Sequence, residues 1–204
     1  MTHLYLIRHA DYLYDLVDGE YPKRDQGLTE EGRIQAEKLR NRLAKTGEIT
    51  PDLLLSSTAR GAKETAEIIA PAFGIPIIYG EDFEEWRSED GTLSTEEFMG
   101  AWNSLSDEQR PYYRWVEGCE TLLEFSVRVC GALNRVLTAH EDKTIVVFTH
   151  GAFIQVSFAY FFGYSMAVPL RAAPEINRTS ITHWYKSERG RWLLERSNDC
   201  HHLD

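Results

Sequence analysis

The chain has 204 residues, 43% of them hydrophobic, which is enough for one compact domain with a buried core. Its formal net charge is −10, from 32 acidic and 22 basic residues, so it lacks the basic excess of a general nucleic-acid or anionic-membrane surface. Any bound anion must therefore meet locally placed cations. Cys119, Cys130 and Cys200 are widely spaced without a C-x-x-C pair, which predicts neither a disulfide framework nor a zinc cluster.

Two features bear on location. An apolar run begins at Leu4, directly after the first residues, and we expect no secretion leader. The most apolar later stretch, "AFIQVSFAYFFG", is interrupted by Gln155 and Ser157 and is too short for a membrane span, which needs about 20 apolar residues. We expect a cytoplasmic protein without membrane or nucleic-acid partners.

Short apolar runs without alternation predict strands that are covered on both faces, as in a parallel sheet between helices. Such runs are "HLYLIR", "PDLLLSS", "IPIIYG" and "TIVVFTH". Helices are predicted between them: one capped by Thr29, one over "RGAKETAEIIAPAFG" that ends near Pro71 or Gly74, and one over "TLLEFSVRVCGALNRVL". The alternation predicts an α/β fold, a three-layer sandwich with a mostly parallel central sheet flanked by helices. The tail, "TSITHWYKSE" and "RWLLERS", predicts an antiparallel hairpin or two edge strands.

Residues 80–118 do not fit this alternation, because they mix acids with aromatic residues over a length unusual for a connection. We interpret them as a partly helical lid inserted into a single domain that spans residues 1–204. The aromatic rings are expected to pack the lid onto the body rather than to contact a ligand directly.

Polar residues follow several predicted strands at the edge where ligands of open α/β sheets bind. Arg8 and His9 follow the first strand, Arg60 follows "LLLSSTA", and His150 with Gly151 opens a helix after "TIVVFT". Each histidine alone is equally well explained by a structural role, but two arginines and two histidines together favour an oxyanion. No third histidine or carboxylate lies at the spacing typical of metal ligands, so we expect no metal ion or cofactor. The predicted ligand is a phosphoryl group.

Several motifs resemble the histidine phosphatase superfamily, the phosphoglycerate mutase-like group. They are "LYLIRHAD", "LTEEGRIQAEKL", "DLLLSSTARGAKETAEIIA", "IVVFTHGAFIQ" and the closing "SNDCHHL", and they cover nearly the whole chain. The order of the motifs makes the resemblance specific, whereas the arginine-histidine triplet alone would be weak. The resemblance implies a phosphoglycerate mutase-like fold.

The resemblance also implies a mechanism. His9 would attack phosphorus and become a phosphohistidine, while Arg8, Arg60 and His150 surround the phosphoryl oxygens without a metal ion. A carboxylic acid would protonate the leaving oxygen and then activate water. The family places this glutamate two residues after a hydrophobic one, which selects Glu85 over the neighbouring Glu84.

This chain departs from the family pattern at three positions. Ala10 replaces the usual glycine after the histidine, Gly61 stands where an arginine is common, and Asp15 appears where many members have asparagine. The second departure puts the role of Arg60 in question. Lys23 or Arg24 is an alternative cation for the third.

Three functions remain open. The first is a phosphatase that acts on a small phosphorylated metabolite, or on a phosphoprotein, with water as the final acceptor. The second is a phosphoglycerate mutase-type phosphoryl transfer, and the third is a non-catalytic, phosphate-binding regulatory module. The compact chain favours hydrolysis over the mutase, and retention of His9 and His150 argues against the module. Neither the substrate nor the oligomeric state follows from the sequence.

Overall fold

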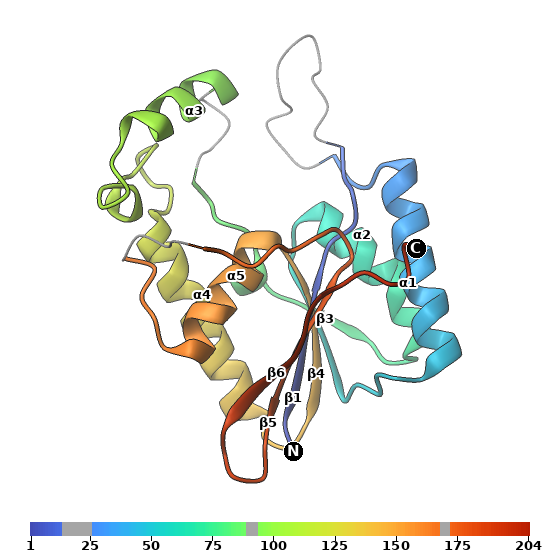
Figure 1. The fold of residues 1–204 in the computed structure, drawn as a ribbon. Coiled ribbons are helices and arrows are strands. Elements are labelled where there is room, and N and C mark those ends of the chain that lie inside the picture. Colours follow the sequence, from blue (N-terminus) through green and yellow to red (C-terminus); the bar gives the residue numbers. More distant parts are fainter. Residues whose placement is uncertain (14–25, 89–93, 168–171) are drawn as a thin grey trace.

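The computed structural model describes residues 1–13, 26–88, 94–167 and 172–204. Within these ranges the strands form one six-stranded sheet of order β3-β2-β4-β1-β5-β6 (Figure 1). The strands are β1 (His3–Arg8), β2 (Leu53–Ser56), β3 (Ile77–Tyr79), β4 (Thr144–Thr149), β5 (Ile181–Lys186) and β6 (Trp192–Asp199). The first four in spatial order run parallel, and β5 and β6 are antiparallel to their neighbours. The expected mostly parallel sheet and terminal hairpin are confirmed.

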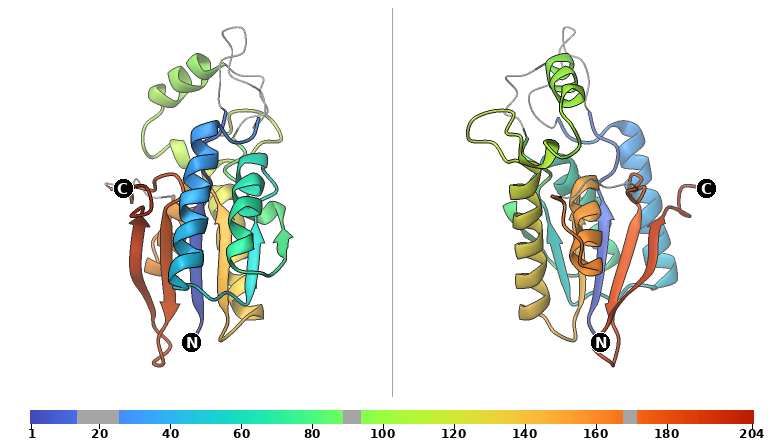
Figure 2. Two further views of the ribbon diagram at one scale, coloured as in Figure 1. Left: turned by 90° about the vertical axis from the view of Figure 1, so that its right-hand side faces the viewer. Right: turned by 60° about the vertical axis from the view of Figure 1, so that its left-hand side comes forward.

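Helices cover both faces of this sheet (Figure 2). The helices are α1 (Glu30–Thr46), α2 (Arg60–Ile69), α3 (Thr95–Ser104), α4 (Leu122–Ala139) and α5 (Gly151–Phe162), with short 3-10 turns at Ala70–Ala72, Glu81–Phe83 and Arg110–Tyr112. α1 and α2 pack on one face, and α4 and α5 on the other. The three-layer α/β architecture is therefore confirmed.

The central strand β1 shows why the apolar runs do not alternate. Leu4 and Leu6 belong to the core beneath α4 and α5, while Tyr5 and Ile7 belong to the core beneath α1. Since both faces of the strand are buried, both sets of side chains gain from the removal of apolar surface from water.

The predicted cap at the start of α1 is present. Thr29 Oγ1 accepts a hydrogen bond from the backbone nitrogen of Gly32 at 2.9 Å, which satisfies one of the free amides at the start of α1. The helix ends at Gly47, whose positive φ of 60° suits a residue without a side chain. α2 ends at Ile69, slightly before the expected Pro71, because a 3-10 turn continues it through Ala70–Ala72.

The described part of residues 80–118 lies beyond the carboxyl end of the sheet (Figure 1). Its rings pack largely against one another: the ring centroids of Trp115 lie 4.7 Å from Tyr113 and 5.7 Å from Trp102. Trp86 joins this cluster to the body, because it contacts Trp102 and donates from Nε1 to the carbonyl oxygen of Glu120 at 3.0 Å. No helix in the described ranges has the length and apolar character needed to cross a membrane.

Candidate active site

The two predicted histidines meet because their strands are neighbours. β1 and β4 are parallel, and Arg8 pairs with Thr149, so His9 and His150 leave the sheet side by side. Their ring centroids are 4.9 Å apart, and only 4% and 6% of their surfaces are exposed. The structure thus brings both histidines together at the carboxyl edge of the sheet.

The hydrogen bonds of His9 define its tautomer. Nδ1 lies 2.8 Å from the carbonyl oxygen of Ala10, and a carbonyl only accepts, so Nδ1 carries the hydrogen and Nε2 keeps a free lone pair. Burial lowers the pKa of His9 well below its usual value, and the nearby His150 and Arg178 lower it further. The imidazole is therefore neutral at physiological pH, with Nε2 in the form that a nucleophile needs.

His150 is fixed at the amino end of α5. Its Nε2 lies 2.8 Å from Ser57 Oγ, and Ser57 follows β2, the strand on the other side of β4. Burial lowers the pKa of His150 to about 3, with further contributions from Arg8 and Arg178. Its ring is neutral and acts as a polar group, not as a fixed charge.

Arg8 brings a full positive charge to the end of β1, as arginine remains protonated in proteins. One of its terminal nitrogens donates to the carbonyl oxygen of Ile176, while Nε is buried without a hydrogen-bond partner among the described residues. A Cβ added at Gly151 would lie 3.3 Å from the Arg8 guanidinium carbon, so the glycine allows the guanidinium to approach α5 closely. Arg8 Nε can therefore donate a further hydrogen bond at this site.

The neighbouring carboxyls Glu84 and Glu85 differ in their surroundings. Glu85 accepts from the backbone nitrogens of Trp86 at 3.0 Å and Ala152 at 3.1 Å, and burial raises its pKa. Glu84 instead pairs with Arg87 at 2.8 Å and accepts from the Thr58 hydroxyl. Glu85 is therefore the carboxyl that lies beside the start of α5, and a raised pKa is what a proton donor requires.

The side chain of Arg60, which was predicted to bind the phosphoryl group, pairs with Glu64 instead. Its Nε lies 2.7 Å from Glu64 Oε1, and 59% of its side chain is exposed. Glu64 also accepts from the backbone nitrogen of Leu28 at 2.9 Å, so the carboxylate that holds Arg60 is itself fixed. In this structure Arg60 serves as the partner of Glu64. The other cations considered from the sequence, Lys23 and Arg24, and the departure at Asp15 lie outside the described residues.

The site contains an arginine that the sequence analysis missed. Arg178 Nη1 lies 3.1 Å from His9 Nε2, and its guanidinium carbon lies 4.9 Å from the centre of the Tyr12 ring. It precedes β5, which is antiparallel to β1, so the beginning of β5 lies beside the end of β1. The tail was predicted as a hairpin without its place in the sheet, and that missing register hid Arg178.

A second missed residue, Arg128 on α4, holds the segment that contains Glu85. Its two terminal nitrogens donate to the carbonyl oxygens of Asp82 at 3.0 Å, Glu84 at 3.1 Å and Glu85 at 3.0 Å. Its Nε pairs with Glu120 at 2.6 Å. Arg128 therefore fixes the backbone from which the Glu85 carboxyl projects.

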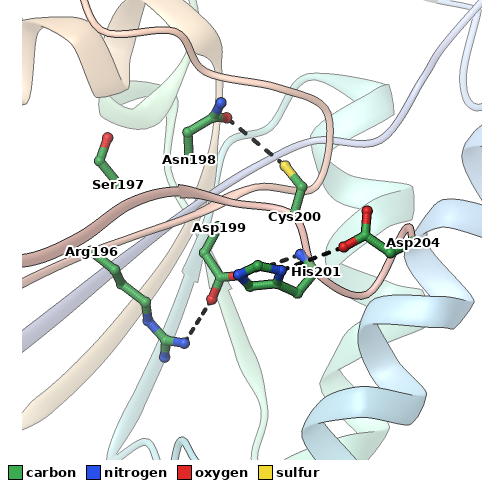
Figure 3. Close-up of a pocket in the computed structure, with 7 residues that line it drawn as sticks. All are labelled: Arg196, Ser197, Asn198, Asp199, Cys200, His201 and Asp204. Carbon is green, nitrogen blue, oxygen red and sulfur yellow. Dashed lines mark hydrogen bonds and ion pairs between the residues drawn. The ribbon is translucent and has the colours of Figure 1, made fainter.

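A surface hollow of about 520 Å³ lies at the C-terminal tail, lined by residues 196–201 and Asp204 (Figure 3). It contains none of the predicted site residues. The carboxylate of Asp199 is occupied there by Arg42 and Arg196, at 2.7 and 2.8 Å. This network attaches the tail to α1 and leaves no free charge for a ligand on Asp199.

The described residues contain no group of three or more His, Cys, Asp or Glu side chains arranged to hold a metal ion. The site gathers one neutral histidine with an unprotonated Nε2, a second neutral histidine, two arginines and a partly buried carboxyl. This combination of side chains is the one expected around a phosphoryl group.

Comparison with known proteins identifies the family. Residues 4–200 match the model of the histidine phosphatase superfamily (branch 1), and the chain belongs to this family. It is 32% identical to 5''-phosphoribostamycin phosphatase of Niallia circulans over 98% of this chain and 97% of that protein. It is 26% identical to the probable phosphoglycerate mutase GpmB of Salmonella typhi, over 100% and 96% of the two chains.

Solved structures share the fold. Bacillus stearothermophilus YhfR superposes with a TM-score of 0.78 at 24% identity, over 100% of both chains. A phosphoserine phosphatase mutant from Entamoeba histolytica, in complex with phosphoserine, gives a TM-score of 0.73 at 24% identity, again over 100% of both chains. The expected phosphoglycerate mutase-like fold is thereby confirmed.

Proposed function

We propose that this protein is a phosphatase that hydrolyses a phosphomonoester through a phosphohistidine on His9. The observation that carries the proposal is the unprotonated Nε2 of a buried, neutral His9, whose Nδ1 lies 2.8 Å from the Ala10 carbonyl oxygen. Membership of the histidine phosphatase superfamily and similarity to a named phosphatase support the same chemistry.

In the first step, Nε2 of His9 attacks phosphorus and the bond from phosphorus to the ester oxygen breaks. Glu85, whose pKa is raised by burial, acts as the acid and gives its proton to the departing oxygen. His9 Nδ1 keeps its hydrogen and donates it to the Ala10 carbonyl oxygen, which stabilises the positive ring that forms. Arg8, His150 and the backbone at Gly151 bind the phosphoryl oxygens, where charge develops in the transition state.

In the second step, the Glu85 carboxylate takes a proton from water as the water oxygen attacks phosphorus. The bond between phosphorus and Nε2 breaks, so inorganic phosphate leaves and both His9 and protonated Glu85 are restored. Since arginine and histidine donors supply the electrostatic stabilisation, the proposed chemistry is independent of metal ions. Arg60 takes part in this scheme only if its side chain leaves Glu64.

The proposed substrate is a small phosphorylated metabolite in the cytoplasm. The names of the relatives refer to 5''-phosphoribostamycin in one case and to phosphoserine in another. We propose that the 80–118 segment acts as a lid. Its aromatic rings contact one another, and the ring centroids of Trp102 and Trp115 lie 5.7 Å apart. An activity screen over phosphorylated metabolites would identify the substrate.

The test is release of phosphate from an aryl phosphate in the presence of a chelator. We expect turnover by the native protein and none by His9→Ala, with both proteins equally folded by circular dichroism. Denaturation in alkaline detergent during turnover should trap a phosphoenzyme in the native protein only, and this phosphoenzyme should be stable to base and labile to acid. A requirement for added divalent metal, or turnover that survives in His9→Ala, would contradict the proposal.

A mutase remains the second candidate, because several similar proteins are described as probable phosphoglycerate mutases. In that reaction the phosphohistidine returns its phosphoryl group to the bound organic molecule rather than to water. Incubation with 3-phosphoglycerate separates the two: a phosphatase releases inorganic phosphate, whereas a mutase forms 2-phosphoglycerate. A regulatory module would bind phosphate and do neither.

A further inference from the structure

The positive charge supplied by Arg8 alone is smaller than the negative charge of a phosphomonoester dianion. A phosphomonoester carries up to two negative charges, while His9 and His150 are neutral. Arg8 supplies one positive charge, and Arg60 is paired with Glu64 at 2.7 Å. A second arginine in contact with the reacting nitrogen would balance the dianion.

Arg178 occupies that place. Its Nη1 lies 3.1 Å from His9 Nε2, the nitrogen that would bond to phosphorus, and 3.4 Å from Nδ1, so it lies over the imidazole ring beside Nε2. A phosphoryl group on Nε2 would place its anionic oxygens next to Nη1, which could then donate to them instead of contacting the neutral ring. Hydrogen bonds between charged partners are roughly twice as strong as neutral ones, so the exchange is favourable.

The acidic partner of Arg178 is too distant to neutralise it fully. Its Nε lies 3.8 Å from Asp11 Oδ1, and 28% of the arginine side chain and 39% of the Asp11 side chain are exposed. A partly exposed pair at this distance is weak. The Tyr12 ring beneath the guanidinium, 4.9 Å away, orients the group without removing its hydrogen-bond donors.

The turn before β5 holds Arg178 in position. Thr179 has a positive φ of 54°, which is unfavourable for a β-branched residue and has to be maintained by its surroundings. Its hydroxyl donates to the carbonyl oxygen of Arg178 and lies 2.8 Å from His202 Nε2, while its backbone nitrogen donates to the carbonyl oxygen of His9. Asn198 accepts from the backbone nitrogen of Asn177 at 2.6 Å, which fixes the other side of the turn. The arginine is thus presented by a rigid turn braced by the C-terminal tail.

We propose that Arg178 binds the phosphoryl group during its transfer to and from His9, as the second cation of the site beside Arg8. This inference rests on the proposed phosphatase function and adds a residue to it. Arg178 Nη1 contacts the ring of His9 in this structure, and it transfers its donors to phosphoryl oxygens when the substrate binds.

The experiment compares Arg178→Ala and Arg178→Lys with a matched surface variant, Arg40→Ala, on an aryl phosphate. Arg40 lies on α1 beside Asn41, away from the pocket. We expect Arg178→Ala to lose about 10²-fold or more in kcat/KM, as for other deleted donors to a transition-state oxyanion. Its inhibition by inorganic phosphate should weaken in parallel. Lysine should restore part of the loss, because it keeps the charge but not the planar pair of donors.

The pH dependence of kcat/KM distinguishes a charge effect of Arg178 on His9 from a purely structural role, which would leave the pH profile unchanged. Arg178 is one of the groups, with burial, His150 and Arg8, that keep the pKa of His9 low. In Arg178→Ala the pKa of His9 should rise, so the acidic limb of the kcat/KM profile should shift to higher pH. Thermal unfolding of each variant checks the fold, and Arg178→Gln replaces Arg178→Ala if the latter unfolds.

Two outcomes would overturn the inference: unchanged kcat/KM and phosphate inhibition in Arg178→Ala, or faster turnover, which would mean that Arg178 only blocks Nε2. Failure of the underlying function is distinguishable. If turnover survives in His9→Ala, the proposed phosphohistidine mechanism is wrong. If turnover is lost in His9→Ala but unchanged in Arg178→Ala, only the proposed role of Arg178 is wrong.

Discussion

The carboxylate of Glu85 lies 3.1 Å from the backbone nitrogen of Ala152, in the first turn of the helix that follows His150. The proposed proton donor and the second histidine are therefore held by the same short stretch of α5. The start of α5 therefore fixes the position of the Glu85 carboxyl relative to His150.

The first prediction separates the two adjacent carboxyls. Glu85→Gln removes the proton donor, and we expect its kcat for substrates with poor leaving groups to fall by about 10²-fold or more. Aryl phosphates with good leaving groups need less help and should lose less. Glu84→Gln is the matched control, since that side chain pairs with Arg87 and Thr58. Equal effects of the two variants on alkyl phosphate turnover would remove the assignment.

The second prediction concerns Arg128 as a positioning residue. Arg128→Ala frees the carbonyl of Glu85 and those of its neighbours, so the acid should lose its fixed position while binding of phosphate persists. We expect a fall of about 10-fold in kcat for alkyl phosphates with little change in KM, in line with the cost of misplacing a reacting group. Arg135→Ala is the control, because Arg135 lies on the same helix and pairs with the side chain of Asp82.

A double variant tests whether Arg128 acts through Glu85. If it does, adding Arg128→Ala to Glu85→Gln should cost little more than Glu85→Gln alone. Multiplicative losses would show that the arginine contributes by some other route, and the positioning role would then be wrong.

The third prediction links acid stability to His150. Its pKa is lowered to about 3 in the folded protein, against about 6.5 in an unfolded chain. Between these values the unfolded state binds a proton that the folded state does not, so stability falls as pH is lowered through this window. Above the unfolded pKa the contribution is constant. The Tm of the native protein should therefore drop more steeply than that of His150→Asn between about pH 6.5 and about pH 4. Parallel Tm curves would contradict this.

The fourth prediction uses the contact between Gly151 and Arg8. A methyl group at position 151 would lie 3.3 Å from the guanidinium carbon, closer than side chains usually approach. Gly151→Ala should push Arg8 away and raise KM for an aryl phosphate several-fold, with the helix retained because alanine favours helices. Gly100→Ala in α3 is the control, since an added Cβ there meets no atom within 4 Å. An unchanged KM in Gly151→Ala would show that Arg8 does not need this space.

The parallel part of the fold could be predicted from the sequence because its signals are local. Apolar runs such as "HLYLIR" need cover on both faces, and Thr29 caps its helix through atoms three residues away. The meeting of His9 and His150 followed from one general rule, that the ends of neighbouring parallel strands share an edge.

The remaining parts of the site depend on long-range geometry. Arg178 reaches His9 only because β5 pairs antiparallel with β1, and the sequence of the tail does not specify its partner. Arg60 was placed by its position at the start of α2, but its rotamer is set by Glu64, one helical turn further on. Arg128 acts through backbone carbonyls, which every sequence possesses, so no residue pattern could have marked it.

The position of β1 also has a consequence for synthesis of the chain. It leaves the ribosome long before its two neighbours in the sheet, β4 (Thr144–Thr149) and β5 (Ile181–Lys186). The chain is made from its amino end, so the strand before His9 lacks both neighbours until these later segments have been synthesised. A nascent chain that stops before residue 176 holds the proposed nucleophile without the turn that carries Arg178. The proposed activity should therefore appear only after β5 has been synthesised.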